Sequence, residues 1–115
     1  MTFEEYKRIG EKYNLEFFEY DNCFYLKGYT TSYNLLYQVT EFKGDENGGF
    51  GCVFCECVIS NINHSIYPSG KHYSSLTAKG FEEQIKLFFR NYKKALIELK
   101  TRELEKDFED VTWAT

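Results

Sequence analysis

The sequence predicts an α+β domain in which a four-stranded antiparallel meander sheet is flanked by a short N-terminal helix and a long C-terminal helix, in the order α-β-β-β-β-α. Two patterns predict this fold. Apolar residues recur every three or four positions between Phe81 and Phe108, as on an amphipathic helix. An aromatic, β-prone block between Leu15 and Ile59 is the surface against which that helix would pack. The 115 residues fit one domain, 1–115, with residues 109–115 as a candidate flexible tail.

The N-terminal helix is predicted from a capping box at Thr2 and Glu5. In such a box the Thr hydroxyl and the Glu carboxylate each bond a free backbone N–H. Phe3 and Tyr6 then lie on one side of the helix, and Asn14 ends it.

Four strand-like runs follow, at residues 15–20, 23–29, 33–43 and 50–59. Asp21-Asn22 suits a tight turn between the first two runs, and residues 44–49 form a flexible, Gly-rich loop. Because these connections are short, neighbouring strands are expected to be antiparallel. Residues 60–75 contain the single Pro with several Asn, Ser and Gly residues, and we expect a long loop there with room for short extended pieces.

The long helix is expected to begin near Gly80, since Glu82 and Glu83 would then lie in its first turn; a start capped by Thr77 is the alternative. A helix from there to Phe108 would be about 40 Å long, which exceeds the width of the sheet. Either the helix breaks near Thr101 or its end projects from the domain.

The two faces of the second strand should differ. Phe24 and Leu26 are expected to face the long helix, and the residues that then face away are Cys23, Tyr25, Lys27 and Tyr29. Either the N-terminal helix covers this second, aromatic face, which we favour, or the face forms an interaction patch.

Aromatic residues make up 19% of the chain, with 11 Phe and 10 Tyr, which is more than one small core needs. Some Tyr side chains are therefore expected at the surface, where a ring with a polar tip suits binding. The alternative is a codon bias, because the same composition is typical of AT-rich genomes. The net charge of −4 argues mildly against a general nucleic-acid-binding protein.

Cys52, Cys55 and Cys57 resemble a metal or redox motif, and His64 or His72 could complete a zinc site. The alternation of side chains along a strand argues against three thiols meeting at one ion, because Cys52 points to one face of the strand and the other two thiols point to the opposite face. We therefore expect buried, reduced thiols, no metal, no cofactor and no catalytic residue. Glu56 is expected at the exposed end of the same strand, where it interrupts an apolar face that consists of Phe50, Cys52, Phe54 and Val58.

Two charged surfaces are predicted on the long helix. Its basic face consists of Lys86, Arg90, Lys93 and Lys94, and it is followed by acidic residues that include Glu103, Glu105 and Asp107. The simpler interpretation is a solvated surface with ion pairs four residues apart. The alternative is a docking surface for a charged protein or for nucleic acid.

A small acidic domain that is rich in Tyr, Phe and Asn and has no catalytic constellation is similar in style and size to phage and mobile-element proteins that block host defences, anti-CRISPR proteins among them. The resemblance rests on no diagnostic motif. It implies a non-catalytic inhibitor that occupies a functional surface of a bacterial defence protein or nuclease. The partner-binding residues are then expected to be Tyr25, Lys27, Tyr29, Glu103, Glu105 and Asp107.

The main alternative is an accessory module that binds single-stranded nucleic acid through surface Tyr residues together with Lys86, Arg90, Lys93 and Lys94. An enzyme or metalloprotein that uses the Cys and His residues is a third hypothesis. A homodimer is possible. The sequence shows neither a membrane span nor a signal peptide, so we expect a protein of the cytoplasm, that of the host cell if a phage encodes it.

Overall fold

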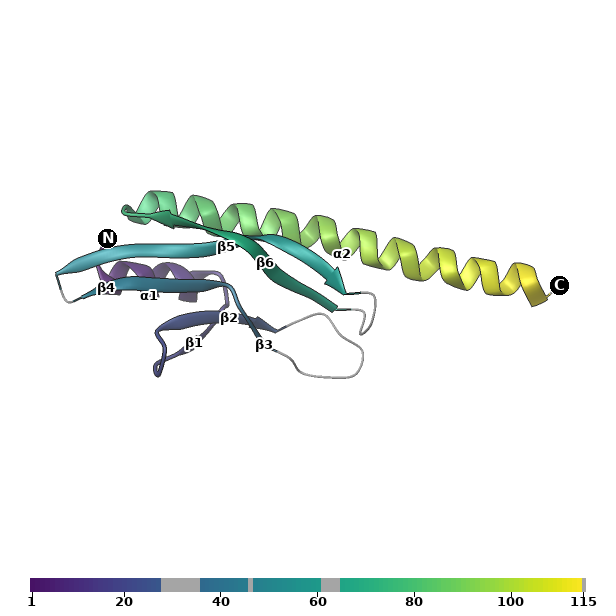
Figure 1. Ribbon diagram of the computed structural model, residues 1–115, viewed down its shortest axis with the longest axis horizontal. Coiled ribbons are helices and arrows are strands. Elements are labelled where there is room, and N and C mark those ends of the chain that lie inside the picture. Colours follow the sequence, from purple (N-terminus) through teal and green to yellow (C-terminus); the bar gives the residue numbers. More distant parts are fainter. Residues whose placement is uncertain (28–35, 46, 61–64, 115) are drawn as a thin grey trace.

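The computed structural model describes residues 1–27, 36–45, 47–60 and 65–114, and within them a short helix, antiparallel strands and a long helix follow one another along the chain (Figure 1). This confirms the predicted α+β class and the order of helix, strands and helix. The elements are α1 (Phe3–Lys12), β1 (Glu16–Phe18), β2 (Cys23–Lys27), β3 (Leu36–Gln38), β4 (Thr40–Asp45), β5 (Gly48–Ser60), β6 (Ser65–Ser75) and α2 (Ala78–Ala114).

The strands form two three-stranded sheets, β1-β2-β3 and β4-β5-β6, and every pair is antiparallel. Val39 alone separates β3 from β4 and joins the two sheets. Its N–H donates to the Phe24 carbonyl at 2.8 Å, and its carbonyl accepts from the Phe54 N–H at 2.9 Å. The strand predicted at residues 33–43 is therefore bent at Val39 in its described part, and the meander order of the strands is kept.

Two stretches predicted as loops are largely strand. Gly44 and Gly49 pair across β4 and β5, which narrows the loop expected at residues 44–49 to a tight hairpin. β6 occupies Ser65–Ser75, where a long loop was expected. Pro68 is tolerated there because β6 is an edge strand of its sheet, and one irregularity in the β5–β6 register lies next to Gly70 (φ +79°).

The predicted capping box is present at the start of α1. The Thr2 hydroxyl accepts from the Glu5 N–H at 3.1 Å, and the Glu5 carboxylate accepts from the Thr2 N–H at 2.9 Å. Tyr6, Ile9 and Gly10 form the buried side of the helix.

The start of α2 follows the alternative prediction. The helix begins at Ala78, and the Thr77 hydroxyl accepts from the Gly80 N–H at 3.0 Å. It continues through Thr101 without a break for 37 residues, or about 55 Å, so its C-terminal part projects beyond the strands (Figure 1). Residues 109–114 lie within this helix, and the flexibility predicted for residues 109–115 stays a prediction.

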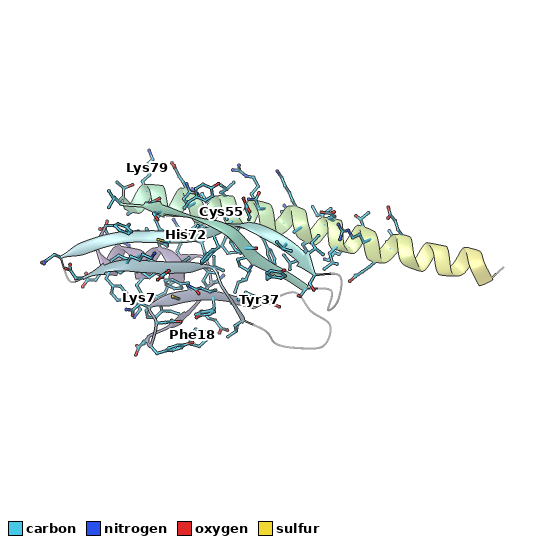
Figure 2. The ribbon with its side chains drawn as sticks, viewed as in Figure 1. Lys7, Phe18, Tyr37, Cys55, His72 and Lys79 are labelled. Carbon is cyan, nitrogen blue, oxygen red and sulfur yellow. The ribbon has the colours of Figure 1, made fainter. Side chains whose placement is uncertain are left out.

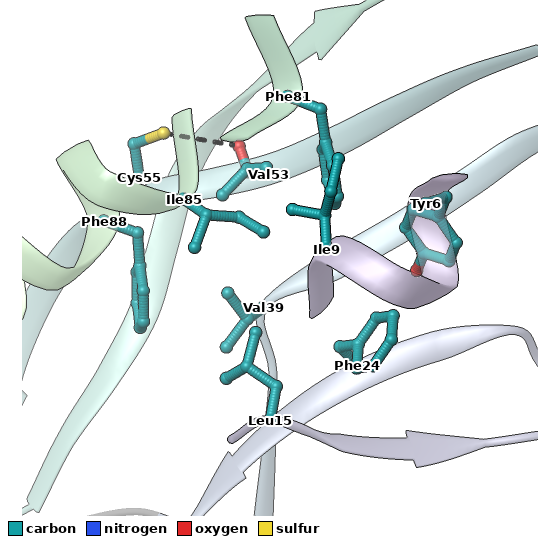
Figure 3. Close-up of a cluster of buried hydrophobic side chains, with 10 residues drawn as sticks. All are labelled: Tyr6, Ile9, Leu15, Phe24, Val39, Val53, Cys55, Phe81, Ile85 and Phe88. Carbon is teal, nitrogen blue, oxygen red and sulfur yellow. Dashed lines mark hydrogen bonds between the residues drawn. The ribbon is translucent and has the colours of Figure 1, made fainter. Parts of the chain in front are cut away.

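Both helices contribute to one core on the same side of the strands (Figure 3). The Tyr6 ring of α1 lies 5.2 Å from the Phe81 ring of α2 and 5.3 Å from the Phe24 ring of β2. The expectation that the N-terminal helix covers the second face of the sheet is therefore wrong, because α1 packs beside α2. The buried cluster consists of Tyr6, Ile9, Leu15, Phe24, Val39, Val53, Cys55, Phe81, Ile85 and Phe88.

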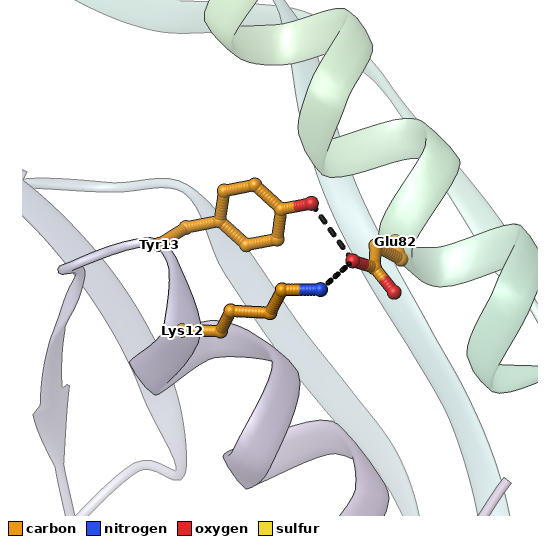
Figure 4. Close-up of polar contacts among 3 residues, drawn as sticks. All are labelled: Lys12, Tyr13 and Glu82. Carbon is orange, nitrogen blue, oxygen red and sulfur yellow. Dashed lines mark hydrogen bonds and ion pairs between the residues drawn. The ribbon is translucent and has the colours of Figure 1, made fainter.

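A polar contact also joins the two helices (Figure 4). One carboxylate oxygen of Glu82, in the first turns of α2, accepts from the Lys12 ammonium at 2.7 Å and from the Tyr13 hydroxyl at 2.8 Å. These hydrogen bonds lower the pKa of the Glu82 carboxyl, the bond from Lys12 having the larger effect.

Candidate functional site

The face of sheet β4-β5-β6 that is turned away from the helices carries exposed apolar side chains. Val53 and Cys55 of β5 face the core, so alternation turns Phe54 to the opposite face. In Figure 1, β4 and β5 pass in front of α1, and α2 runs along the upper side of β5 and β6. We call the face that carries Phe54 the open sheet face; its exposed and half-buried members include Glu41, Lys43, Phe50, Phe54, Glu56, Val58, Tyr67, Ser69 and His72.

Several rings on this face reach the solvent. Phe50 and Val58 are each 37% exposed, and Phe54 is half-buried. The His72 ring stands edge-on to the Phe54 ring with the centroids 5.6 Å apart. Aromatic and aliphatic surface of this kind, with polar residues between, is typical of interaction sites.

The bend at Val39 adds a residue of β3 to this face. The Tyr37 ring lies 5.6 Å from the Tyr67 ring of β6, and the hydroxyl groups of Tyr37 and Ser65 are 3.3 Å apart. Figure 2 shows Tyr37 and His72 on these neighbouring strands. A small cavity of about 240 Å³, which we call the Phe54 pocket, lies where β3, β5 and β6 meet. Its lining residues are Tyr37, Gln38, Phe54, Pro68, Ser69 and Gly70.

The Glu56 carboxylate lies between the Phe54 pocket, where it rests on the lining residue Gly70, and a groove beside α2 that it lines together with Lys94. A Cβ atom on Gly70 would lie only 2.1 Å from the Glu56 Oε2 atom, so the Glu56 side chain rests directly against the Gly70 backbone. Glu56 is exposed, as predicted, but it lies within β5, which continues to Ser60, and not at the end of the strand. It makes no ion pair with any described side chain. The pocket therefore has aromatic walls and an anionic rim.

A larger groove of about 580 Å³ runs between β5 and the middle of α2. Its charges balance, with Lys94 and Arg102 opposed by Glu56 and Glu98. The Arg102 guanidinium and the Glu98 carboxylate also pair with each other at 2.6 Å. Since none of the described residues that line this groove is aromatic, we place the candidate site at the Phe54 pocket and not here.

The aromatic residues that the sequence singled out are differently placed. Tyr25 faces away from the Phe24 side of β2 as expected, but its hydroxyl donates to the Asp21 carboxylate and its ring packs edge-on against Phe18 at 4.8 Å. The hydrogen bond to Asp21 is the main cause that raises the pKa of Tyr25. Lys27 lies at the end of β2 with its side chain outside the described residues, and Tyr29 lies outside them entirely.

Apart from Lys27, the predicted charged residues lie on α2, and of its basic residues Lys94 lines the groove beside Glu56. The four cations Lys86, Arg90, Lys93 and Lys94 are exposed, as predicted, on a helix that covers the opposite face of the strands. Glu105 is exposed and Glu103 half-buried beyond the last buried turn, while Asp107 is helical with its side chain outside the described residues. The structure thus does not bring these charges together with the rings of the open sheet face.

The cysteines follow the predicted alternation. The Cys52 sulfur lies 3.2 Å from the Ser74 hydroxyl on one face, and the Cys55 thiol donates to the Gln84 carbonyl at 3.4 Å on the other. Burial raises the pKa of Cys55 and of Cys57 to about 11 and that of Cys23 to about 12, so these three thiols are protonated at neutral pH and are poor nucleophiles.

Within the described ranges, no group of three or more His, Cys, Asp or Glu side chains is placed to hold a metal ion. His64, which the zinc hypothesis used, lies outside those ranges.

Sequence reasoning found part of this site. Alternation in the fourth predicted strand already grouped Phe50, Phe54 and Val58 on one face. The signal for the pocket was missing, because its other walls come from the bend at Val39 and from β6, which was predicted as a loop.

Comparison with protein-family models, with curated proteins and with solved structures finds no match. In the described part of the chain, neither helix combines the length and the apolar character needed to cross a membrane.

Proposed function

We propose that this protein is a non-catalytic binding protein that covers part of a protein partner with its open sheet face. The observation that carries the proposal is the row of half-exposed rings beside the Phe54 pocket, on a sheet face that neither described helix covers. Apolar surface that is contiguous in this way and lies beside a pocket is a common feature of protein-interaction sites.

The charges favour a protein over nucleic acid as the partner. Glu41 and Glu56 stand on the open sheet face, where Lys43 is the one cation with a described side chain. Of the four basic residues of α2, Lys94 lines the groove beside Glu56, and none of the four is among the described residues that line the Phe54 pocket; the net charge is −4. Binding to single strands needs rings and cations on one surface, so the arrangement argues against it.

The proposal extends to the class of partner. The composition resembles that of phage and mobile-element proteins that block host defences, so the proposed partner is a bacterial defence protein or nuclease in the host cytoplasm. Occupying a functional surface of such a protein would inhibit it without any bond being made or broken.

The test is affinity capture from the lysate of a low-GC bacterium, with bound proteins measured by quantitative mass spectrometry. Three baits are compared: the wild type, the open-face variant Phe50→Ser/Val58→Ser, and the control Ile97→Ser, which changes a 58% exposed residue on α2. Thermal unfolding first establishes that all three are folded.

We expect the wild type and the control to retain the same protein and the open-face variant to retain about ten-fold less, because interface rings and aliphatic side chains dominate binding energy. Equal retention by the three baits would contradict the proposal. A gel shift with single-stranded DNA and RNA at low salt tests the alternative; a shift that Lys86→Gln/Arg90→Gln/Lys93→Gln abolishes would support nucleic-acid binding instead.

A further inference from the structure

We propose that the Phe54 pocket receives an aromatic side chain from an extended, cationic segment of the partner, and that a Lys or Arg of the same segment pairs with Glu56. This inference rests on the proposed function and adds the chemistry of the partner. The motif that the open sheet face would recognise is an aromatic residue and a cation two positions apart.

The size and lining of the pocket suit one side chain. At about 240 Å³ the cavity is smaller than typical sites for whole small-molecule ligands. The Phe54 and Tyr37 rings and Pro68 provide apolar walls, against which a ring packs favourably. Aromatic side chains seated in well-packed pockets are enriched among the residues that dominate the binding energy of protein interfaces.

The polar groups of the pocket favour a ring that carries a donor. The Gln38 amide nitrogen donates to the Cys23 sulfur at 3.2 Å and to the Thr40 carbonyl at 3.3 Å. Both bonds use the nitrogen, and the part of the chain that the structure describes offers no donor to the Gln38 amide oxygen. That oxygen would accept from a Tyr hydroxyl or a Trp N–H of the partner.

Charge complementarity identifies the second contact. The Glu56 carboxylate is exposed at the pocket rim against Gly70, and Glu41 stands on the same face. Phe54 and Glu56 are two residues apart in β5, on either side of the register shift, so their side chains stand on the order of 7 Å apart. An extended ligand repeats its side chains at the same interval, so an aromatic residue at one position and a cation two positions away would meet both groups.

The test selects random 12-residue peptides displayed on phage against the immobilised wild-type protein, and then measures the affinity of the enriched peptides by fluorescence anisotropy. We expect Tyr or Trp two positions from Lys or Arg to be enriched. Backbone amide shifts of Gln38, Ser69 and Gly70 should move on titration, which locates the peptide at the pocket.

Three variants separate the two contacts. Glu56→Gln should weaken binding about five-fold at low salt, as the loss of one surface ion pair does, and the difference from wild type should vanish at high salt. Ser69→Trp, which blocks the pocket from its rim without removing a wall, should weaken binding at least ten-fold. The control Glu83→Gln removes an exposed carboxylate of α2 and should change nothing.

Several outcomes would overturn this inference: no enrichment, enrichment of acidic peptides, equal affinity for Glu56→Gln, or displacement of the peptides by single-stranded DNA. If one of these results is obtained while Phe50→Ser/Val58→Ser still loses the captured partner, the inference about the pocket is wrong and the proposed function stands. The proposed function fails when that open-face variant retains the partner.

Discussion

At the scale of single residues, the contact between Gly10 and Phe24 sets the distance of α1 from the sheet. A Cβ atom on Gly10 would lie 2.3 Å from two carbons of the Phe24 ring. We expect Gly10→Ala to lower the free energy of unfolding by about 1–3 kcal/mol through overpacking, although the same change in an exposed helix usually stabilises by about 1 kcal/mol. Urea unfolding measures the effect. The exposed neighbour Glu11→Ala is the control and should stay within about 0.5 kcal/mol of the wild type; a stabilised Gly10→Ala would contradict the packing.

The buried hydroxyl of Tyr6 is the second residue-scale feature. It donates to the Asn22 carbonyl at 2.7 Å and lies 2.7 Å from the Thr40 hydroxyl, which also accepts from the Phe24 N–H. Burial raises the pKa of this phenol, so Tyr6 stays neutral and able to donate. Tyr6→Phe should cost about 1–2 kcal/mol in unfolding free energy, because it leaves buried groups without a partner. Tyr73→Phe, at a 44% exposed ring, provides the matched comparison and should be nearly neutral.

At the scale of elements, Glu82 makes the contact between α1 and α2 depend on pH. The folded-state pKa of Glu82 is lowered by Lys12 and Tyr13 from an ordinary 4.5. A lowered pKa means that the stabilisation is present above about pH 4.5 and is lost as the pH falls through the folded-state value. The difference in urea midpoint between the wild type and Glu82→Gln should therefore be largest near neutral pH and shrink in acid. A difference that grows in acid, or an equal effect of the neighbouring Glu83→Gln, would contradict this.

The long helix α2 divides into a packed part and a projecting part. Leu99 is 2% exposed and packs with Ile66 of β6 and Ala95, whereas Leu104 is 70% exposed. Leu99→Ala should cost about 2–4 kcal/mol, and a chain that stops after Thr101 should keep a melting temperature within a few degrees of the full-length value. Circular dichroism on both variants checks the division. A truncated chain that no longer unfolds cooperatively would show that the projecting part stabilises the fold.

The elements that sequence reasoning predicted correctly are those with local signals. The capping box at Thr2 and Glu5 and the apolar spacing of α2 are both contained within a few turns of chain. β6 has no such signal, since Ser, Pro and Gly interrupt it; its strand conformation depends on pairing with β5. The same reason explains why the sequence grouped Phe54 with its strand neighbours but could not assemble the pocket around it.

Tyr25 shows a limit of another kind. Alternation placed its side chain on the correct face of β2, but the Asp21 carboxylate that holds its hydroxyl lies four residues earlier, in the turn. Whether a surface ring is free or engaged depends on such contacts, which residue type and spacing do not reveal.

At the scale of the whole molecule, the projecting helix makes the protein elongated. Its extents are 67 × 24 × 22 Å and its radius of gyration is 17.0 Å, whereas a compact chain of this length would have about 13 Å. Small-angle X-ray scattering of the monomer should therefore give a value close to 17 Å. A value near 13 Å would show that α2 folds back. The homodimer stays a prediction, and sedimentation equilibrium would establish it by a doubled mass.

The reach of α2 also affects how the molecule can be labelled. From Leu99 to Ala114 the helix extends about 22 Å past its last described buried side chain. A fluorophore attached near residue 114 would therefore lie well away from the strands. Immobilising the protein on a surface through the same position would leave the rings of β5 and β6 accessible to molecules in solution.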